Sequence, residues 1–232
     1  MMNLLSTIQW EQLFDWQLAK EAAPYILKNG LWNTMWISVV TMILGLLVAL
    51  VVAIARMSPY RLLRYPARVY ISIIRGTPLL VQLFILYFGL PVIGITLEPI
   101  TVAIIGLTAS VGGYASETIR GAILSIPRGQ WEAATSLNMS YRQTMRRVIL
   151  PQAARVALPS LMNSFLSLVK DTSLLTVITV PEMLYYAKIV GGRSYDYMTV
   201  YLIVALYYWV ICTVLNALQE RLEKHYNRFT NI

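Results

Sequence analysis

Apolar stretches of about 20 residues recur along this 232-residue sequence, at roughly 31–55, 69–92, 100–119, 157–180 and 198–218. A helix of about 20 apolar residues crosses the hydrocarbon core of a bilayer. Within that core a helix satisfies its own backbone hydrogen bonds. Hydrophobic residues make up 57% of the chain and charged residues only 13%, which excludes an ordinary soluble domain. The sequence therefore predicts an all-α, polytopic membrane protein, with five transmembrane helices in a single domain over 1–232.

The second apolar stretch carries an interruption, Arg75-Gly76-Thr77-Pro78. Thr77 is expected to be an N-cap, and Pro78 the first residue of a new helix. This span is therefore predicted to break or to restart near Thr77.

The arginines are distributed unevenly between the loops, and this predicts the topology. They concentrate in 56–68 and 120–155, and further basic residues follow Gln219. Cytoplasmic loops carry an excess of Lys and Arg, so these segments and the C-terminus are assigned to the cytoplasm and the N-terminus to the outside. Residues 1–30 are predicted to form an amphipathic segment on the membrane surface, and 181–197 a mobile outer loop.

Residues 127–151 form a polar, basic interruption between two apolar regions. A short helix is predicted around Glu132-Ala133-Ala134, and Asn138 is placed at a turn because Asn tolerates left-handed geometry. A second basic helix is expected to follow and to end at Pro151. Such a helix–turn–helix is too polar for a bilayer, so it would lie in water and offer a docking surface to another protein.

This spacing resembles the EAA loop of the ABC-importer permeases, although that family usually has Gly where this chain has Asn138. In that family the loop docks into a groove on a separate ATPase subunit. The resemblance makes 120–155 a coupling loop and implies these ATPase-contacting residues: Glu132, Ala133, Ala134, Asn138, Leu150 and Pro151. The chain has no G-x-x-x-x-G-K-[ST] motif, so no cofactor is expected in it, and ATP and Mg would bind to the partner.

Polar residues inside the apolar stretches are the candidate solute contacts: Arg75, Thr77, Glu117, Asn163, Ser167, Lys170 and Asp171. Those on the fourth stretch recur every three or four residues, so they are expected to share one helix face. An ionisable group near the bilayer centre costs about 2.5–3.5 kcal/mol, so it normally faces protein or a watery cavity. Two interpretations stay open. Lys170 or Arg75 could form an ion pair with Asp171 or Glu117, or these charges could contact a solute.

Further motifs resemble those of polar amino-acid permeases: Arg75 to Leu79, Gly112 to Glu117, Arg120-Gly121 and Lys170 to Leu174. The segments 143–147 and 151–155 are especially similar to bacterial L-cystine permeases. The resemblance implies a bacterial plasma-membrane importer of a polar amino acid. In that family, five-helix permeases dimerise and work with ATPases and an external solute-binding protein. A homodimer is expected here, with lipid contacts but no nucleic-acid partner.

Other functional classes find little support in the sequence. His225 is the only histidine and Cys212 the only cysteine, which leaves little material for catalysis or for a metal site. A secondary transporter or a channel subunit is the alternative. Neither needs an ATPase-docking loop, and no pore-filter segment is evident.

Overall fold

The computed structural model describes residues 14–227, except for the side chains at 222, 223 and 225–227. Within this part the chain is almost entirely helical and has no strand. Its elements are α1 (Trp16–Met57), α2 (Arg61–Gly76), α3 (Leu79–Phe84), η2 (Ile85–Gly89), η3 (Leu90–Ile93), α4 (Pro99–Leu124), α5 (Arg128–Ser136), α6 (Tyr141–Thr144), η4 (Met145–Ile149), α7 (Leu150–Asp171), η5 (Thr172–Ile178), α8 (Met183–Ser194) and α9 (Tyr197–Asn227). The segments η2 and η4 are π-helical, whereas η3 and η5 are 3₁₀-helical.

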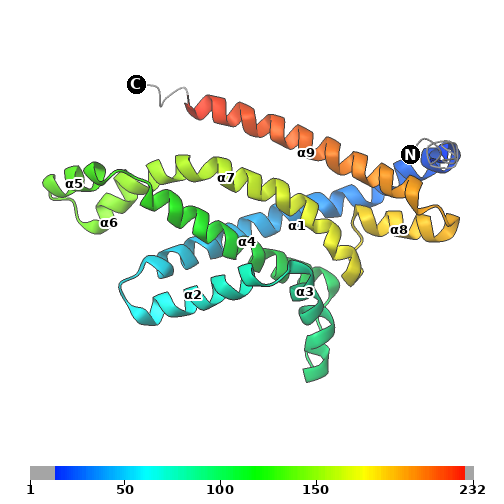
Figure 1. Cartoon of the computed structure of the whole chain (residues 1–232), viewed down its shortest axis with the longest axis horizontal. Coiled ribbons are helices and arrows are strands. Elements are labelled where there is room, and N and C mark those ends of the chain that lie inside the picture. The colour runs from blue at the N-terminus through cyan, green and yellow to red at the C-terminus, as the bar shows by residue number, and fades with distance from the viewer. Residues whose placement is uncertain (1–13, 228–232) are drawn as a thin grey trace, which may run out of the picture.

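Four long helices are apolar enough to cross a membrane: Trp16–Met57, Pro99–Leu124, Tyr141–Ile178 and Tyr197–Arg221. The pair Arg61–Gly76 and Leu79–Ile93, bent by 104° at the break between them, makes a fifth candidate span if its two halves are taken together. Figure 1 shows α3 turning away from α2, while α5 and α6 lie at the opposite end of the molecule from α8. The predicted all-α membrane fold is confirmed, with four candidate spans, or five when the bent pair is included.

The first helix is longer than the sequence predicted. Asp15 caps it by accepting hydrogen bonds from the N–H groups of Gln17 and Leu18. From there α1 runs without interruption for 42 residues, which is about 63 Å by the helical rise. The described part of the predicted surface segment is thus continuous with the first span. The rest of that segment, residues 1–13, lies outside the described residues.

The core forms where α1 and α4 pack along each other, with α2 and α7 beside them. Small residues on α4 allow its neighbouring helices to approach it closely. A Cβ atom added to Gly113 would lie 2.6 Å from Cγ2 of Ile74 on α2, a distance that real Cβ contacts do not reach. Packing of this kind holds helices together in lipid, where no hydrophobic force drives one helix against another.

The predicted break near Thr77 is present, but the predicted cap is wrong. Pro78 occupies the N-cap position of α3, and Thr77 ends α2. The Thr77 hydroxyl donates to the carbonyl of Ile73 at 2.8 Å and accepts from Nε2 of Gln82 at 2.9 Å. Gln82 therefore braces the bend, because its amide also donates to the carbonyl of Ile74 at 3.0 Å.

In the coupling loop the predicted turn is confirmed, but the predicted end at Pro151 is wrong. Asn138 has a φ of 53°, in the left-handed region. Ser140 and Gln143 then form a capping box at the start of α6. The helix continues through the π-helical turn η4 and past Pro151 to Asp171. A proline ring clashes with the carbonyl four residues earlier in an α-helix, and here the turn directly before Pro151 is π-helical instead.

One prediction in the C-terminal part also needs correction. Residues 181–197 were expected to be a mobile loop, yet they contain the 12-residue helix α8. Buried Ala187 and Gly191 pack this helix into the molecule. The basic segment after Gln219 continues α9 as far as Asn227. Residues 228–232 lie outside the described part.

Candidate functional site: a polar pocket and an exposed loop

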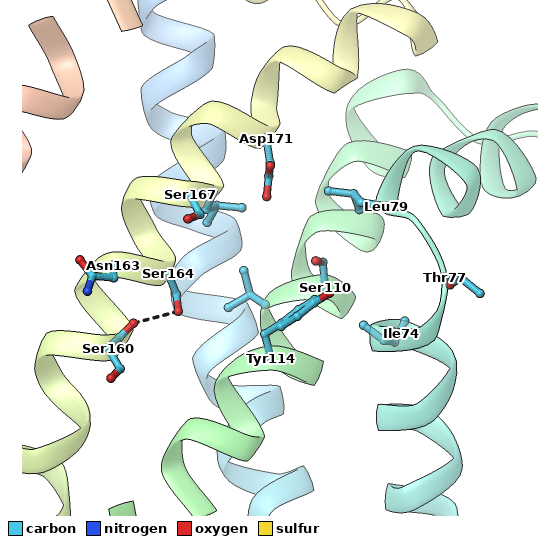
Figure 2. A pocket seen from close by; sticks show the side chains of 12 residues that line it. Ile74, Thr77, Leu79, Ser110, Tyr114, Ser160, Asn163, Ser164, Ser167 and Asp171 are labelled. Atoms are coloured by element: carbon cyan, nitrogen blue, oxygen red, sulfur yellow. Dashed lines mark hydrogen bonds between the residues drawn. The ribbon is translucent and has the colours of Figure 1, made fainter. Parts of the chain in front are cut away.

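A pocket of about 380 Å³ opens between α2, α4 and α7, beside the break after Gly76. We call it the polar pocket. It is lined by Ile74, Thr77, Leu79, Ser110, Val111, Tyr114, Ser160, Asn163, Ser164, Ser167, Leu168 and Asp171. In Figure 2, Ser160 lies at one end of the α7 wall and Asp171 at the other.

The wall formed by α7 confirms the predicted shared face for most of its polar residues. Asn163, Ser167 and Asp171 follow one another at intervals of four and all line the pocket. The Ser164 hydroxyl donates to the carbonyl of Ser160 at 2.9 Å, so the hydrogen of this hydroxyl is bound within α7 (Figure 2). Lys170 was expected on the same face. It is exposed and lies outside the pocket lining, because neighbouring residues are about 100° apart around a helix.

The opposite wall comes from α4 and the end of α2. Ser110 and Tyr114 are one helical turn apart on α4, and Thr77 lies at the bend. The guanidinium of Arg75 lies over the ring of Tyr114, 5.5 Å from its centroid. Arg75 is therefore held at the back of a lining side chain without lining the pocket itself. Cation–π contacts of this type contribute about 0.5–1 kcal/mol where they are exposed.

Glu117 lies outside the polar pocket and belongs to an ion cluster at the end of α1 and α4. Its carboxylate is 2.9 Å from Nη2 of Arg120 and 3.6 Å from Nε of Arg56. The sequence left open an ion pair of Glu117 with Lys170 or Arg75. The structure supplies different partners, and one of them comes from α1. This cluster therefore ties two helices together.

Asp171 has a different environment from Glu117. It is half-buried at the end of α7, and no salt bridge reaches it within residues 14–227. The ion pair of Asp171 with Lys170 or Arg75, which the sequence left open, is thus not formed. The polar pocket consequently combines one free carboxylate with serine, threonine and asparagine side chains that both donate and accept hydrogen bonds. Such a set can bind a polar solute that carries a positive charge.

The coupling loop is anchored to the ends of α4 and α7 by a small apolar cluster. Buried members of this cluster include Ile123, Ile126, Ile149 and Ala153. Trp131 packs on it and stacks on Tyr141, with ring centroids 6.3 Å apart. The loop is therefore a folded unit with a defined shape.

The six predicted coupling residues divide between the surface and the interior of this loop. Glu132, Ala133, Asn138 and Pro151 are exposed, and Leu150 is half-buried. Ala134 is only 3% exposed, and its carbonyl accepts from the N–H of Met139 across the turn. Ala133 thus offers surface, whereas Ala134 packs inside.

A buried polar cluster around Glu182 was not predicted from any sequence pattern. This side chain is 0% exposed, although it lies between η5 and α8, outside the candidate spans. It caps α8 by accepting from the N–H groups of Leu184 at 2.8 Å and Tyr185 at 2.7 Å, and it accepts from the Tyr208 hydroxyl at 3.0 Å. Burial raises the pKa of Glu182 to about 7, against the lowering effect of these three donors.

The described residues contain no group of three or more His, Cys, Asp or Glu side chains that could hold a metal ion. The hydroxyl, amide and carboxylate groups that line the polar pocket offer hydrogen bonding and charge pairing to a solute.

Comparison with known proteins places these features in a family. Residues 42–228 match the model of the binding-protein-dependent transport system inner membrane component. The chain is 50% identical over 226 residues to YckA of Bacillus subtilis, a probable amino-acid ABC transporter permease, covering 97% of this chain and 100% of that protein. It is 42% identical to TcyB of the same organism, an L-cystine transport system permease, covering 98% of each chain.

Among solved structures, the crystal structure of an amino acid ABC transporter with histidines matches with a TM-score of 0.86 at 32% identity, covering 91% of this chain and 98% of that one. An inward-facing MetNI methionine ABC transporter shares the fold, with a TM-score of 0.73 at 19% identity, covering 87% of this chain and 96% of the other. The chain therefore belongs to the binding-protein-dependent transport system inner membrane components, as a multi-pass permease of the amino-acid ABC transporters.

Proposed function

We propose that this permease carries a polar, zwitterionic amino acid into the cytoplasm through the polar pocket, and that L-cystine is the first substrate to test. The observation that carries the proposal is the unpaired carboxylate of Asp171 in a wall of hydroxyl and amide groups. The 42% identity to an L-cystine permease supports cystine as the lead candidate.

The two charged groups of an amino acid require opposite partners. Asp171 attracts the ammonium group, because it lacks a cationic partner among the described residues. Arg75 lies behind Tyr114 and can reach toward a carboxylate when its contact with the ring opens. Asn163, Ser167 and Thr77 supply the hydrogen bonds that orient the solute.

Membership of the family supports the proposed energy source and partners. An ABC importer permease implies a separate ATPase, which binds ATP and Mg, and a second permease subunit. We assign the second permease to another copy of this chain, and solute delivery to an extracytoplasmic binding protein. The arginine-rich coupling loop and the C-terminus face the cytoplasm in this scheme, and the N-terminus faces outside.

Uptake by the reconstituted complex tests the substrate. Proteoliposomes that hold the permease, its ATPase and the binding protein should accumulate radiolabelled cystine only when ATP is present. Unlabelled cystine should compete best in a panel of polar amino acids. ATP-dependent uptake of a different amino acid, with no competition by cystine, would reject cystine but keep the class. Uptake without ATP hydrolysis would reject the ABC mechanism.

The docking role of the coupling loop is tested by adding an arginine at three neighbouring positions. Ala133→Arg places a bulky charge on exposed surface and should abolish binding of the ATPase while the permease stays folded. Thr135→Arg is the matched control, because it adds the same side chain about 200° around α5. Ala134→Arg should instead unfold the loop, since that site is buried. Normal ATPase binding by Ala133→Arg would refute this docking face.

A further inference from the structure

Glu182 is the centre of a buried group of hydrogen-bonded polar side chains from four helical segments. We call this group the Glu182 cluster. It lies at the start of α8, and Tyr208 brings in α9. Thr34 brings in α1, because its hydroxyl accepts from the N–H of Met183 at 3.4 Å. Thr172 brings in η5, because its Oγ1 lies 3.4 Å from the Tyr208 hydroxyl. Thr34 and Thr172 are completely buried, so water does not compete for these bonds.

The segment that carries Glu182 is held tightly against α1. The side-chain amide of Asn33 donates to the carbonyl of Pro181 at 2.7 Å. A Cβ atom added to Gly30 would lie 2.5 Å from Cα of Met183, so α1 touches this backbone directly. The segment cannot slide without displacing α1, and a change at Glu182 is therefore passed to its polar neighbours.

One of those neighbours is adjacent to the polar pocket. Asp171 lines the pocket, and Thr172 is the next residue along the chain. The Thr172 hydroxyl donates to the carbonyl of Val169 at 2.7 Å, and its oxygen faces Tyr208. Three side chains, Glu182, Tyr208 and Thr172, thus connect the cap of α8 to the residue that follows the pocket carboxylate.

The hydrogen bonds that connect Glu182, Tyr208 and Thr172 can adopt two donor–acceptor arrangements. When Glu182 is ionised, the Tyr208 hydroxyl donates to its carboxylate and the Thr172 hydroxyl donates to the carbonyl of Val169. No hydrogen then lies between the hydroxyl oxygens of Tyr208 and Thr172, so they are not hydrogen-bonded to each other. When Glu182 binds a proton, its hydroxyl can donate to Tyr208. The Tyr208 hydrogen is then released and can turn to Thr172. Uptake of one proton therefore reverses the donor direction of the hydrogen bonds from Glu182 through Tyr208 to Thr172. It also adds a hydrogen bond at Thr172, the residue after Asp171.

We propose that Glu182 is a positioning residue for the polar pocket: proton binding at this carboxyl, relayed by Tyr208, draws Thr172 toward α9 and so changes how Asp171 meets the solute. Only the last step of this proposal, the contact of Asp171 with the solute, rests on the function proposed above. The reversal of the hydrogen bonds stands on the Glu182 cluster itself.

The surroundings of Glu182 favour titration near neutrality. The charge that acts on it is Lys188 of its own helix, and the titratable group facing it from α9 is Tyr208. The described neighbours from α1 and η5 are the neutral hydroxyls of Thr34 and Thr172. With a pKa of about 7, the protonated fraction falls from about nine-tenths near pH 6 to about one-tenth near pH 8.

Infrared difference spectroscopy of the purified permease in lipid nanodiscs tests the proton step without any transport. A protonated-carboxyl C=O band should titrate near neutral pH in the unmodified chain and be absent in Glu182→Gln. In Tyr208→Phe its midpoint should move to higher pH, because the ionised form loses a donor. Tyr207→Phe, which removes a phenol next to Tyr208 in the sequence, should leave the band unchanged. A band that is absent from the unmodified chain, or that survives Glu182→Gln, overturns the proposal.

Uptake kinetics of the full complex then test the relay to the pocket. In the unmodified complex the KM for solute should change several-fold between about pH 6 and pH 8. Thr172→Val, which keeps the shape but removes the hydroxyl, should flatten that change while the infrared band stays. Tyr207→Phe should keep both the pH dependence of KM and the infrared band. If Thr172→Val keeps the full pH dependence of KM, the relay is refuted.

The proposal stays testable if Glu182→Gln fails to fold. The shifted infrared midpoint in Tyr208→Phe and the flattened pH dependence of KM in Thr172→Val then decide whether it holds. If no solute is transported at any pH, the proposed function fails, and the infrared titration still judges the proton step.

Discussion

Two acids of this permease look alike in sequence and differ in the structure. Glu117 on α4 and Asp171 on α7 both interrupt apolar stretches, and both were candidate solute contacts. Glu117 is neutralised by Arg56 and Arg120, which join α1 to α4. Asp171 has no such partner among residues 14–227, and it faces a pocket. A charge in or near a membrane needs a compensating group. Where the protein provides that group the acid is structural, and where it does not, the acid is available to a ligand.

The largest expected effect separates these two roles. Asp171→Asn keeps the shape of the side chain but removes its charge, and it should lower the rate of solute uptake about tenfold or more, because each 1.4 kcal/mol of lost binding is a factor of ten. Its melting temperature should stay near that of the unmodified chain. Uptake and thermal unfolding, measured on the same preparation, check both statements. Normal uptake by this variant would make Asp171 structural as well.

Glu182 extends the comparison to a third acid, one that is buried and hydrogen-bonded but not ion-paired. Its pKa rises from an ordinary 4.5 to about 7 in the folded chain. Between these values the folded state holds the proton and the unfolded state does not, so the free energy of unfolding should fall as the pH rises through this window. Melting temperatures measured from about pH 4 to pH 8 should show the decline, and Glu182→Gln should flatten it. A decline of equal size in Glu182→Gln would assign the effect to other groups.

Glu117→Gln should show the converse of the Asp171 variant. Removing the carboxylate leaves Arg56 and Arg120 without their common partner, which should destabilise the protein by on the order of 1 kcal/mol, since the pair is partly exposed. The KM for solute should not change. Chemical denaturation and uptake kinetics measure the two quantities. A large increase in KM at unchanged stability would place Glu117 in the solute path after all.

The smallest effect is expected at Lys170. This residue is adjacent to Asp171 but exposed and outside the pocket lining. Lys170→Gln should therefore change uptake by less than about twofold, through a weak and solvent-screened interaction with Asp171. Initial uptake rates at subsaturating solute provide the test. A loss as large as that of Asp171→Asn would show that the two charges act together.

Local chemistry predicted the elements that depend on nearby residues. The turn at Asn138 and the bend after Gly76 follow from side chains within a few positions of each other. The shared face of Asn163, Ser167 and Asp171 follows from helical periodicity. These features need no information about distant parts of the chain.

Features decided by distant contacts could not be predicted in this way. The fate of Glu117 depends on Arg56, which lies on another helix. The helix α8 depends on a buried glutamate cap whose third donor, Tyr208, comes from α9. Pro151 was expected to stop a helix, but the π turn before it lets the helix continue. For Glu117 and α8, tertiary packing outweighed the local signal, whereas at Pro151 a local change of helix type did so.

The uninterrupted helix through Pro151 has a mechanical consequence. The coupling loop feeds directly into α7, and Asp171 is the last residue of that helix. From Leu150 to Asp171 the helix is about 33 Å long, so a tilt of only about 5° about the loop end displaces the far end by about 3 Å. The surface that we propose for the ATPase and the carboxylate that we propose for the solute thus lie at opposite ends of one helix.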